Sequence, residues 1–293
     1  MEAMFNAMFP HAEVDKNPGY VKLLVGKENA LVSSEKFDVN RILNGFWFWN
    51  YSELHKVALV SLHIEGTKEH IESMPFPNPI LNILSAIRAS RATGSNEPTQ
   101  LTLINLSPVR TVINLDVLVS IGPYEEVVFE DMDETAMVLT QNVLYRLFSH
   151  SCIQRLDLTN SYLTVYALKI AQEIFCQNQC IQLCIDTTST PYSACPHAEF
   201  MKGLCRAWLS PRWTTPDKQL IISPPLMSEI VTEMALGFRS KILCAVPLTV
   251  LLWHPEYTGA IVIEQNILNN MTRMRFRKRE LAGWGEFFKN LLV

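Results

Sequence analysis

The stretch CIQRLDLTN, residues 152–160, is followed by the similar stretch CIQLCIDTT, residues 180–188. In each stretch, apolar residues alternate with other residues over a short run. The alternating apolar residues are Leu156, Leu158, Leu183 and Ile185. Successive side chains of a strand point to opposite faces, so this alternation predicts a short strand with one buried face. A catalytic motif has no reason to recur, whereas a stacking unit does, and the echo therefore indicates a repeated structural unit.

Two earlier segments, QLTLINL and EEVVFED, show the same alternation. Their apolar pairs are Leu101 with Leu103 and Val127 with Phe129, so successive pairs begin 26, 29 and 27 residues apart. The segments between the pairs have helical periodicity instead. DETAMVLTQNVLYRLFSH and TVYALKIAQEIFCQN both carry apolar residues at spacings of three and four. A β-α unit of about 27 residues therefore repeats.

The unit follows the letter pattern of a leucine-rich repeat, LxxLxLxxNxL. Its apolar positions are occupied by Ile153, Leu156, Leu158 and Leu163. Ser161 stands where asparagine is usual, and the other copies have Met132 and Thr188 at the polar position. We expect these polar side chains to bond neighbouring backbones at the turn. Two flanking strands, with Val60 and Leu62 before and Leu220 and Ile222 after, extend the series.

The sequence predicts an α/β fold, namely an irregular β-α leucine-rich-repeat-like solenoid. It would have a short parallel sheet, helices on its outer side and a β-rich C-terminal cap. LTVLLWHP, GAIVIEQN and MTRMRFRKR are closely spaced strand-like runs typical of antiparallel hairpins. A solenoid needs such a terminal element because its last unit would otherwise expose an apolar face. We expect an N-terminal helical and aromatic cap at 1–56, repeats at 57–223, and a C-terminal cap with strands and a terminal helix at 224–293.

The β-α units resemble ribonuclease-inhibitor-type leucine-rich repeats. EFMKGLCRAWLSPRWTTPDKQLIIS, with the strands that follow it, is similar to nematode F-box-associated proteins. In such families the repeats hold a target protein, while an N-terminal F-box docks onto a ubiquitin ligase. Phe9-Pro10 could begin an F-box, but the following HAEVDKNPGYVK is not its leucine-rich helix. The resemblance thus implies a protein partner and, if residues 1–50 hold a divergent F-box, a ubiquitin-ligase linker subunit.

Composition narrows the classes of partner. The formal charge of −4 and the pI near 6.0 disfavour a general nucleic-acid binder, which needs a positive surface. Glu2 stands where a signal peptide is positive, and no apolar stretch reaches the roughly 18 residues that span a bilayer. The seven cysteines are odd in number, and several lie in apolar runs. We expect a cytoplasmic or nuclear protein that does not bind membranes.

Several motifs that carry chemistry elsewhere have a structural interpretation here. Cys176, Cys180 and Cys184 have spacing C-x3-C-x3-C, unlike common zinc sites, so we expect buried thiols and no cofactor. The acidic run at 130–134 could hold a cation, but a capped helix start is favoured. RMRFRKR could contact RNA. Alternation favours a strand with arginines on its wet face.

The favoured function is a protein–protein interaction scaffold rather than an enzyme. No catalytic motif occurs. Two alternatives stay open: an enzyme, either a hydrolase or a transferase, with an unrecognised site, and a truncated adaptor paralogue. The outward phase of the predicted strands supplies the candidate partner-binding residues, namely Thr102, Val128, Asp157 and Cys184. We expect a concave face lined by these strands to bind the partner. The aromatic run GFWFWN at 45–50 is expected to belong to the N-terminal cap.

Overall fold

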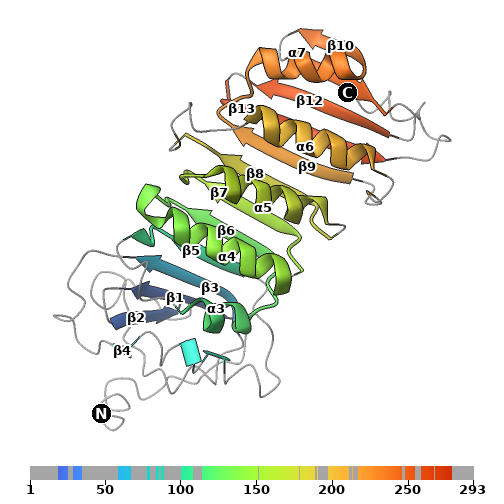
Figure 1. The fold of residues 1–293 in the computed structure, drawn as a ribbon. Coiled ribbons are helices and arrows are strands. Elements are labelled where there is room, and N and C mark those ends of the chain that lie inside the picture. Colours follow the sequence, from blue (N-terminus) through green and yellow to red (C-terminus); the bar gives the residue numbers. More distant parts are fainter. Residues whose placement is uncertain are drawn as a thin grey trace.

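The computed structural model is a mixed α/β structure built on one open, 13-stranded sheet (Figure 1). The sheet begins at β10 and ends at β4, in the order β10-β11-β12-β13-β9-β8-β7-β6-β5-β3-β1-β2-β4. The described residues are 19–25, 29–34, 59–66, 78–79, 84–85, 87–88, 100–107, 114–150, 152–177, 179–188, 190, 197–210, 213, 217–245, 248–254, 259–266 and 268–278.

Seven neighbouring strands of this sheet run parallel. They are β1 (Gly19–Val25), β3 (Leu59–Gly66), β5 (Gln100–Ile104), β6 (Glu126–Glu130), β7 (Arg155–Thr159), β8 (Gln182–Asp186) and β9 (Asp217–Ser223). From β5 to β9 each strand pairs with the next one along the chain. The predicted series of consecutive β-α units is confirmed for this part of the sheet.

The strands align in the predicted phase. One row of side chains consists of Leu101, Val127, Leu156, Leu183 and Leu220. A second row consists of Leu103, Phe129, Leu158, Ile185 and Ile222, and all ten side chains are buried in the main core. In β3 the aligned pair is Leu62 and Ile64, because Leu62 lies opposite Leu101. The predicted pair, Val60 and Leu62, therefore lies two residues before the aligned pair.

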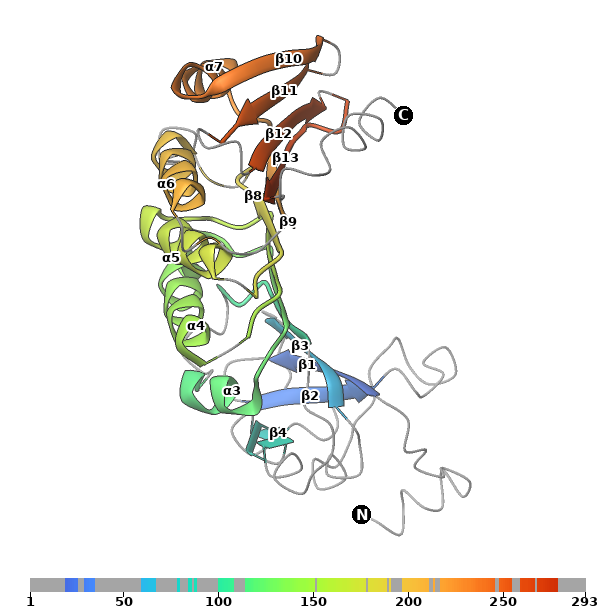
Figure 2. The ribbon, with the colours of Figure 1, turned by 90° about the vertical axis from the view of Figure 1, so that its right-hand side faces the viewer.

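The five α-helices from α3 to α7 cover the same side of the sheet (Figure 2). They are α3 (Leu115–Ile121), α4 (Met137–His150), α5 (Val165–Cys176), α6 (His197–Leu209) and α7 (Ser228–Gly237). Thr164 is the N-cap of α5. Its side chain accepts a hydrogen bond from the Ala167 amide, which would otherwise have no acceptor in the first turn of the helix. Each helix buries its apolar face against the sheet, which confirms the helical periodicity.

Side-chain hydroxyls connect successive turns, as the repeat pattern predicts. Ser161 Oγ lies 2.9 Å from Thr159 O and 3.4 Å from both Phe129 O and the Met132 amide. In the next unit this role belongs to Thr190, whose Oγ1 accepts from the Leu163 amide at 2.9 Å. The predicted residue, Thr188, is exposed and donates to Asp186 and Asn160. The longer turn after β8 moves the buried hydroxyl two residues along.

The C-terminal strands form an antiparallel meander, as predicted. They are β10 (Arg239–Ala245), β11 (Leu248–Trp253), β12 (Gly259–Asn266) and β13 (Met271–Lys278). β10 was not predicted from the sequence. The chain passes from β9 through α7 to the sheet's edge at β10 and then returns, so that β13 pairs with β9. The meander therefore continues the main sheet.

The predicted N-terminal helical and aromatic cap at 1–56 is wrong for the described residues of this range. The described residues within the predicted helical and aromatic cap are strands, because β1 and β2 (Asn29–Ser34) form an antiparallel pair and β1 joins β3. β2 also pairs with β4 (Asn78–Pro79). Three predictions lie outside the described residues: the F-box start, the GFWFWN cap and the terminal helix. Within the described part of the chain, no helix has the length and apolarity required to cross a membrane.

Candidate functional site

The four predicted partner-binding residues form one row across four strands. Thr102 lies opposite Val128, Val128 opposite Asp157, and Asp157 opposite Cys184. Each alternates along its strand with buried core residues, so the row lies on the side of the sheet that the five α-helices leave uncovered (Figure 2). We call this side of β5–β9 and β13 the helix-free face.

Exposure along the row is uneven. Val128, Asp157 and Cys184 are half-buried, as residues on an open face flanked by two strands should be. Thr102 is only 4% exposed, and its hydroxyl has no hydrogen-bond partner among the described residues. It lies opposite His63 of β3 and Val128 of β6. The row therefore offers three accessible residues, and Thr102 is wrong as a surface contact.

Asp157 and Cys184 are held in place by neighbours on their own strands. Asp157 accepts a hydrogen bond of 2.5 Å from Thr159 Oγ1, and its Oδ2 lies 3.5 Å from Arg155 Nη2. Gln182 Nε2 lies 3.3 Å from Cys184 Sγ. Burial raises the pKa of the Cys184 thiol, so this thiol is protonated near neutral pH and is a poor nucleophile. These positioned side chains suit contact with a partner better than covalent chemistry.

The three thiols of the C-x3-C-x3-C run face different surroundings, as the sequence predicts. Cys180 is fully buried in the core, Cys176 is partly buried beside it, and Cys184 belongs to the helix-free face. Burial raises the pKa of Cys176 to about 11 and that of Cys180 to about 12. Both thiols are therefore protonated at neutral pH.

β13 extends the row with arginines. Arg273 lies opposite Ile221 of β9, which lies opposite Cys184. Met274 and Phe276 are fully buried, and the partly exposed Arg273, Arg275 and Arg277 alternate with them. This confirms the prediction that the arginines of the basic run lie on the solvent-facing side of a strand. Local sequence patterns do not place Arg273 in one row with Cys184, because this row forms only when β13 inserts next to β9. The alternation alone identified which side of the strand is wet.

The helix-free face carries carboxylates on β6 and β7, with Arg155 of β7 among them, and arginines on β13. Glu126, Glu130 and Asp157 project from β6 and β7, each in the outward phase of its strand. The arginines of β13 lie beyond β8 and β9. Two of them have carboxylate neighbours, with Arg275 Nη2 3.6 Å from Glu264 Oε2 and Arg277 Nε 4.0 Å from Asp217 Oδ1. These pairs are partly exposed and so contribute little to stability, which leaves the charges available for recognition.

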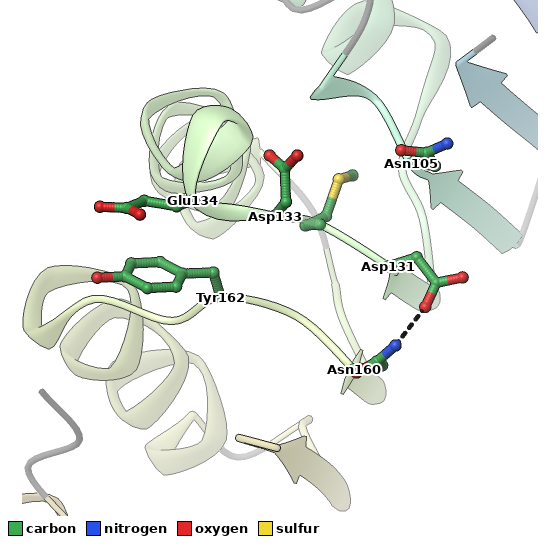
Figure 3. Close-up of a pocket in the computed structure, with 7 residues that line it drawn as sticks. Asn105, Asp131, Asp133, Glu134, Asn160 and Tyr162 are labelled. Carbon is green, nitrogen blue, oxygen red and sulfur yellow. Dashed lines mark hydrogen bonds between the residues drawn. The ribbon is translucent and has the colours of Figure 1, made fainter. Parts of the chain in front are cut away.

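A cavity of about 510 Å³ lies where β5, β6 and β7 end (Figure 3). It is lined by Asn105, Asp131, Met132, Asp133, Glu134, Asn160 and Tyr162. Asn105, Asp131 and Asn160 each follow a strand directly and have φ of 46°, 55° and 44°, a left-handed conformation that asparagine and aspartate tolerate. Asn160 Nδ2 donates to Asp131 Oδ1 at 2.6 Å. The cavity is thus formed by the repeated turn.

The acidic run at 130–134 starts a helix, as favoured above. Asp133 Oδ1 accepts hydrogen bonds from the amides of Thr135, at 2.8 Å, and Ala136, at 3.2 Å, and also from the Ser107 hydroxyl. These bonds cap the 3-10 turn η5 (Glu134–Ala136), which leads into α4. In the described part of the chain, no three His, Cys, Asp or Glu side chains gather in a way that could hold a metal ion.

Asp133→Ala is expected to lower the free energy of unfolding by about 0.5 to 2 kcal/mol, because two helix-start amides lose their acceptor. Burial raises the pKa of Asp133, but hydrogen bonds from Ser107, Thr135 and Ala136 outweigh it and leave the pKa below its usual value. The contribution is therefore present above the unfolded pKa, near 3.9, and is lost as pH falls through the folded value. Urea unfolding of the wild type and Asp133→Asn, which keeps an acceptor oxygen, measures both effects. A pH-independent difference between these two proteins would contradict the charged cap.

Comparison of the chain with protein-family models, with curated proteins and with solved structures finds no match. The geometry of the helix-free face is therefore the basis for a function.

Proposed function

We propose that this chain is a leucine-rich-repeat-like solenoid that acts as a protein–protein interaction scaffold. The sequential parallel pairing from β5 to β9 and the placement of the α-helices on one side support this interpretation. In repeat proteins of this kind, each unit packs on its neighbours and the stack forms an extended binding surface. The helix-free face is that surface.

The observation that carries the proposal is the ordered row of half-buried side chains on the helix-free face. Val128, Asp157, Cys184, Ile221 and Arg273 combine apolar, acidic and basic groups along one line. The backbones of these strands are already hydrogen-bonded on both sides, so a partner has to be recognised through side chains. A row of apolar, acidic and basic side chains that extends over several strands suits a protein segment better than a small molecule.

The resemblance to F-box-associated proteins extends the proposal to a target-binding module of a ubiquitin-ligase adaptor. In that arrangement the helix-free face holds the target, and residues 1–50 contact the ligase linker subunit. The linker contact rests on the sequence alone: the F-box start at Phe9-Pro10 lies outside the described residues, and the described segments of residues 1–50 are the strands β1 and β2.

Affinity purification of the full chain from its native cells tests the scaffold function. The wild type is expected to recover a defined protein, whereas Asp157→Lys and Arg273→Glu should each lose most of it. Both side chains are partly exposed, and urea unfolding of each variant checks that its fold is intact, so that the loss reflects the surface. Lys169→Glu changes an exposed charge on the helix side and is the matched control.

Equal recovery with all three variants would place the binding surface elsewhere and overturn the proposal. Co-purification of the ligase linker subunit, lost when residues 1–50 are altered by substitution, would support the adaptor role. Recovery of the target without the linker would support the scaffold alone.

A further inference from the structure

A second apolar cluster lies apart from the main core, on the C-terminal meander. Leu251, Ala260 and Val262 are 0%, 1% and 2% exposed, and Leu243 and Trp253 pack against them. Leu251 lies directly opposite Val262 across β11 and β12. These residues alternate along their strands with Val250, Leu252, Ile261 and Ile263, which belong to the main core. The second apolar cluster is therefore on the opposite side of the sheet from α7.

The burial of this cluster needs a cover. The five α-helices all lie on the other side of the sheet (Figure 2), and no strand of the described residues packs on this side of β11 and β12. The outward side chains of β6 to β9 are all at least partly exposed, as expected for a sheet face in water, and Val128 and Cys184 are examples. Leu251 and Val262 differ from these residues because almost none of their surface reaches water.

The sequence that follows β13 has the composition and the position to supply this cover. Residues 279–293 read RELAGWGEFFKNLLV and lie outside the described part of the chain. They follow Lys278, which lies opposite Gly259, so the segment starts beside Ala260 of the cluster. Its apolar residues Leu281, Trp284, Phe288 and Leu291 recur at spacings of three and four, as on one side of a helix.

The length of the segment also fits. Fifteen residues of helix would span roughly 22 Å at about 1.5 Å per residue. The three strand intervals from β13 to β10 span roughly 14 Å at about 4.8 Å each. A helix in this segment could therefore cross the whole antiparallel meander and place several apolar side chains over the second apolar cluster.

We infer that residues 279–293 dock on the second apolar cluster and close the helix-free side of the sheet at its C-terminal end. The occupant is this chain's own segment, held by Trp284 and Phe288 against Leu251, Ala260 and Val262. The row from Val128 to Ile221 lies on β6 to β9, outside the meander from β13 to β10, so docking leaves this part of the row open and can be tested separately from the proposed partner binding.

Hydroxyl-radical footprinting of the full chain with mass spectrometry tests this inference, since the radical modifies only side chains that water reaches. Leu251 and Trp253 are expected to be protected in the wild type and to react severalfold faster in Trp284→Ser/Phe288→Ser. Lys289→Ala, a polar change in the same segment, is the matched control and should keep the wild-type pattern. Trp208 is fully buried on the helix side and serves as an internal reference that should stay protected in every variant.

Light scattering on the same samples distinguishes other occupants. A monomer whose Leu251 and Trp253 become reactive only in Trp284→Ser/Phe288→Ser supports docking of the segment. Unchanged protection in the double variant would overturn the inference, and a dimer with such protection would assign the cover to a second copy of the chain. High reactivity of Leu251 in the wild type would also overturn it. Reactivity of Trp208 in the double variant would show that the main core has opened. In that case the single variants Trp284→Ser and Phe288→Ser are measured in place of the double variant, under the same criteria.

Discussion

Leu158→Ala is expected to lower the free energy of unfolding by about 2 to 5 kcal/mol, the usual range when buried leucine methyl groups are deleted. Leu158 is fully buried in the main core, and it lies in one row with Phe129 and Ile185 of the adjacent strands. Neighbours on both sides are fixed by the sheet, so the structure cannot easily collapse into the space left behind. Denaturant unfolding followed by circular dichroism measures the loss.

Asp157→Ala is the matched control, because it changes the adjacent residue of the same strand on the other side of the sheet. Asp157 is bonded to Thr159 and lies near Arg155, and we expect its removal to cost about 1 kcal/mol or less. Equal losses at 157 and 158 would contradict the strand phase. The comparison therefore tests the register on which the helix-free face depends.

Lys218→Met leaves buried acceptors unpaired, which costs about 1 to 3 kcal/mol, and we expect it to lower the free energy of unfolding most above pH 10, where the folded wild type no longer buries a charge. Lys218 is 3% exposed on the helix side of β9, and its Nζ donates to the carbonyls of Phe175 and Gln177 at the end of α5. The ammonium also lies 4.8 Å from the centre of the Trp213 ring. Methionine fills a similar volume but donates no hydrogen bond. Thermal or urea unfolding shows the loss.

The pH dependence of this difference has a definite sign. Burial lowers the pKa of Lys218 from its ordinary value of 10.5 to about 8. Between these values the unfolded chain holds a proton that the folded chain has released, so wild-type stability rises with pH across this window. The gap between wild type and Lys218→Met should therefore widen by about 3 kcal/mol from pH 8 to 10.5. Lys169→Met, on the exposed side of α5, should show no widening, and a constant gap for Lys218→Met would contradict a depressed pKa.

The sequence by itself determined the local structure of the repeats. Alternation identified which side of β5 to β9 and β13 is buried, because a strand places successive side chains on opposite faces whatever its neighbours are. Spacings of three and four identified α4 and α5, and Asp133 signalled a helix start. These features depend on residues close together in the chain, so a single sequence contains the information.

The tertiary structure alone decided which strands are neighbours. β13 pairs with β9 across α7 and three other strands, and only this insertion brings Arg273 into the row with Cys184. The same placement of elements shields Thr102 on the helix-free face and gives Lys218, in phase with Leu220 and Ile222, its acceptors at the end of α5. Pairing between distant segments depends on how all the elements pack together, and the local pattern of a strand does not specify its partner.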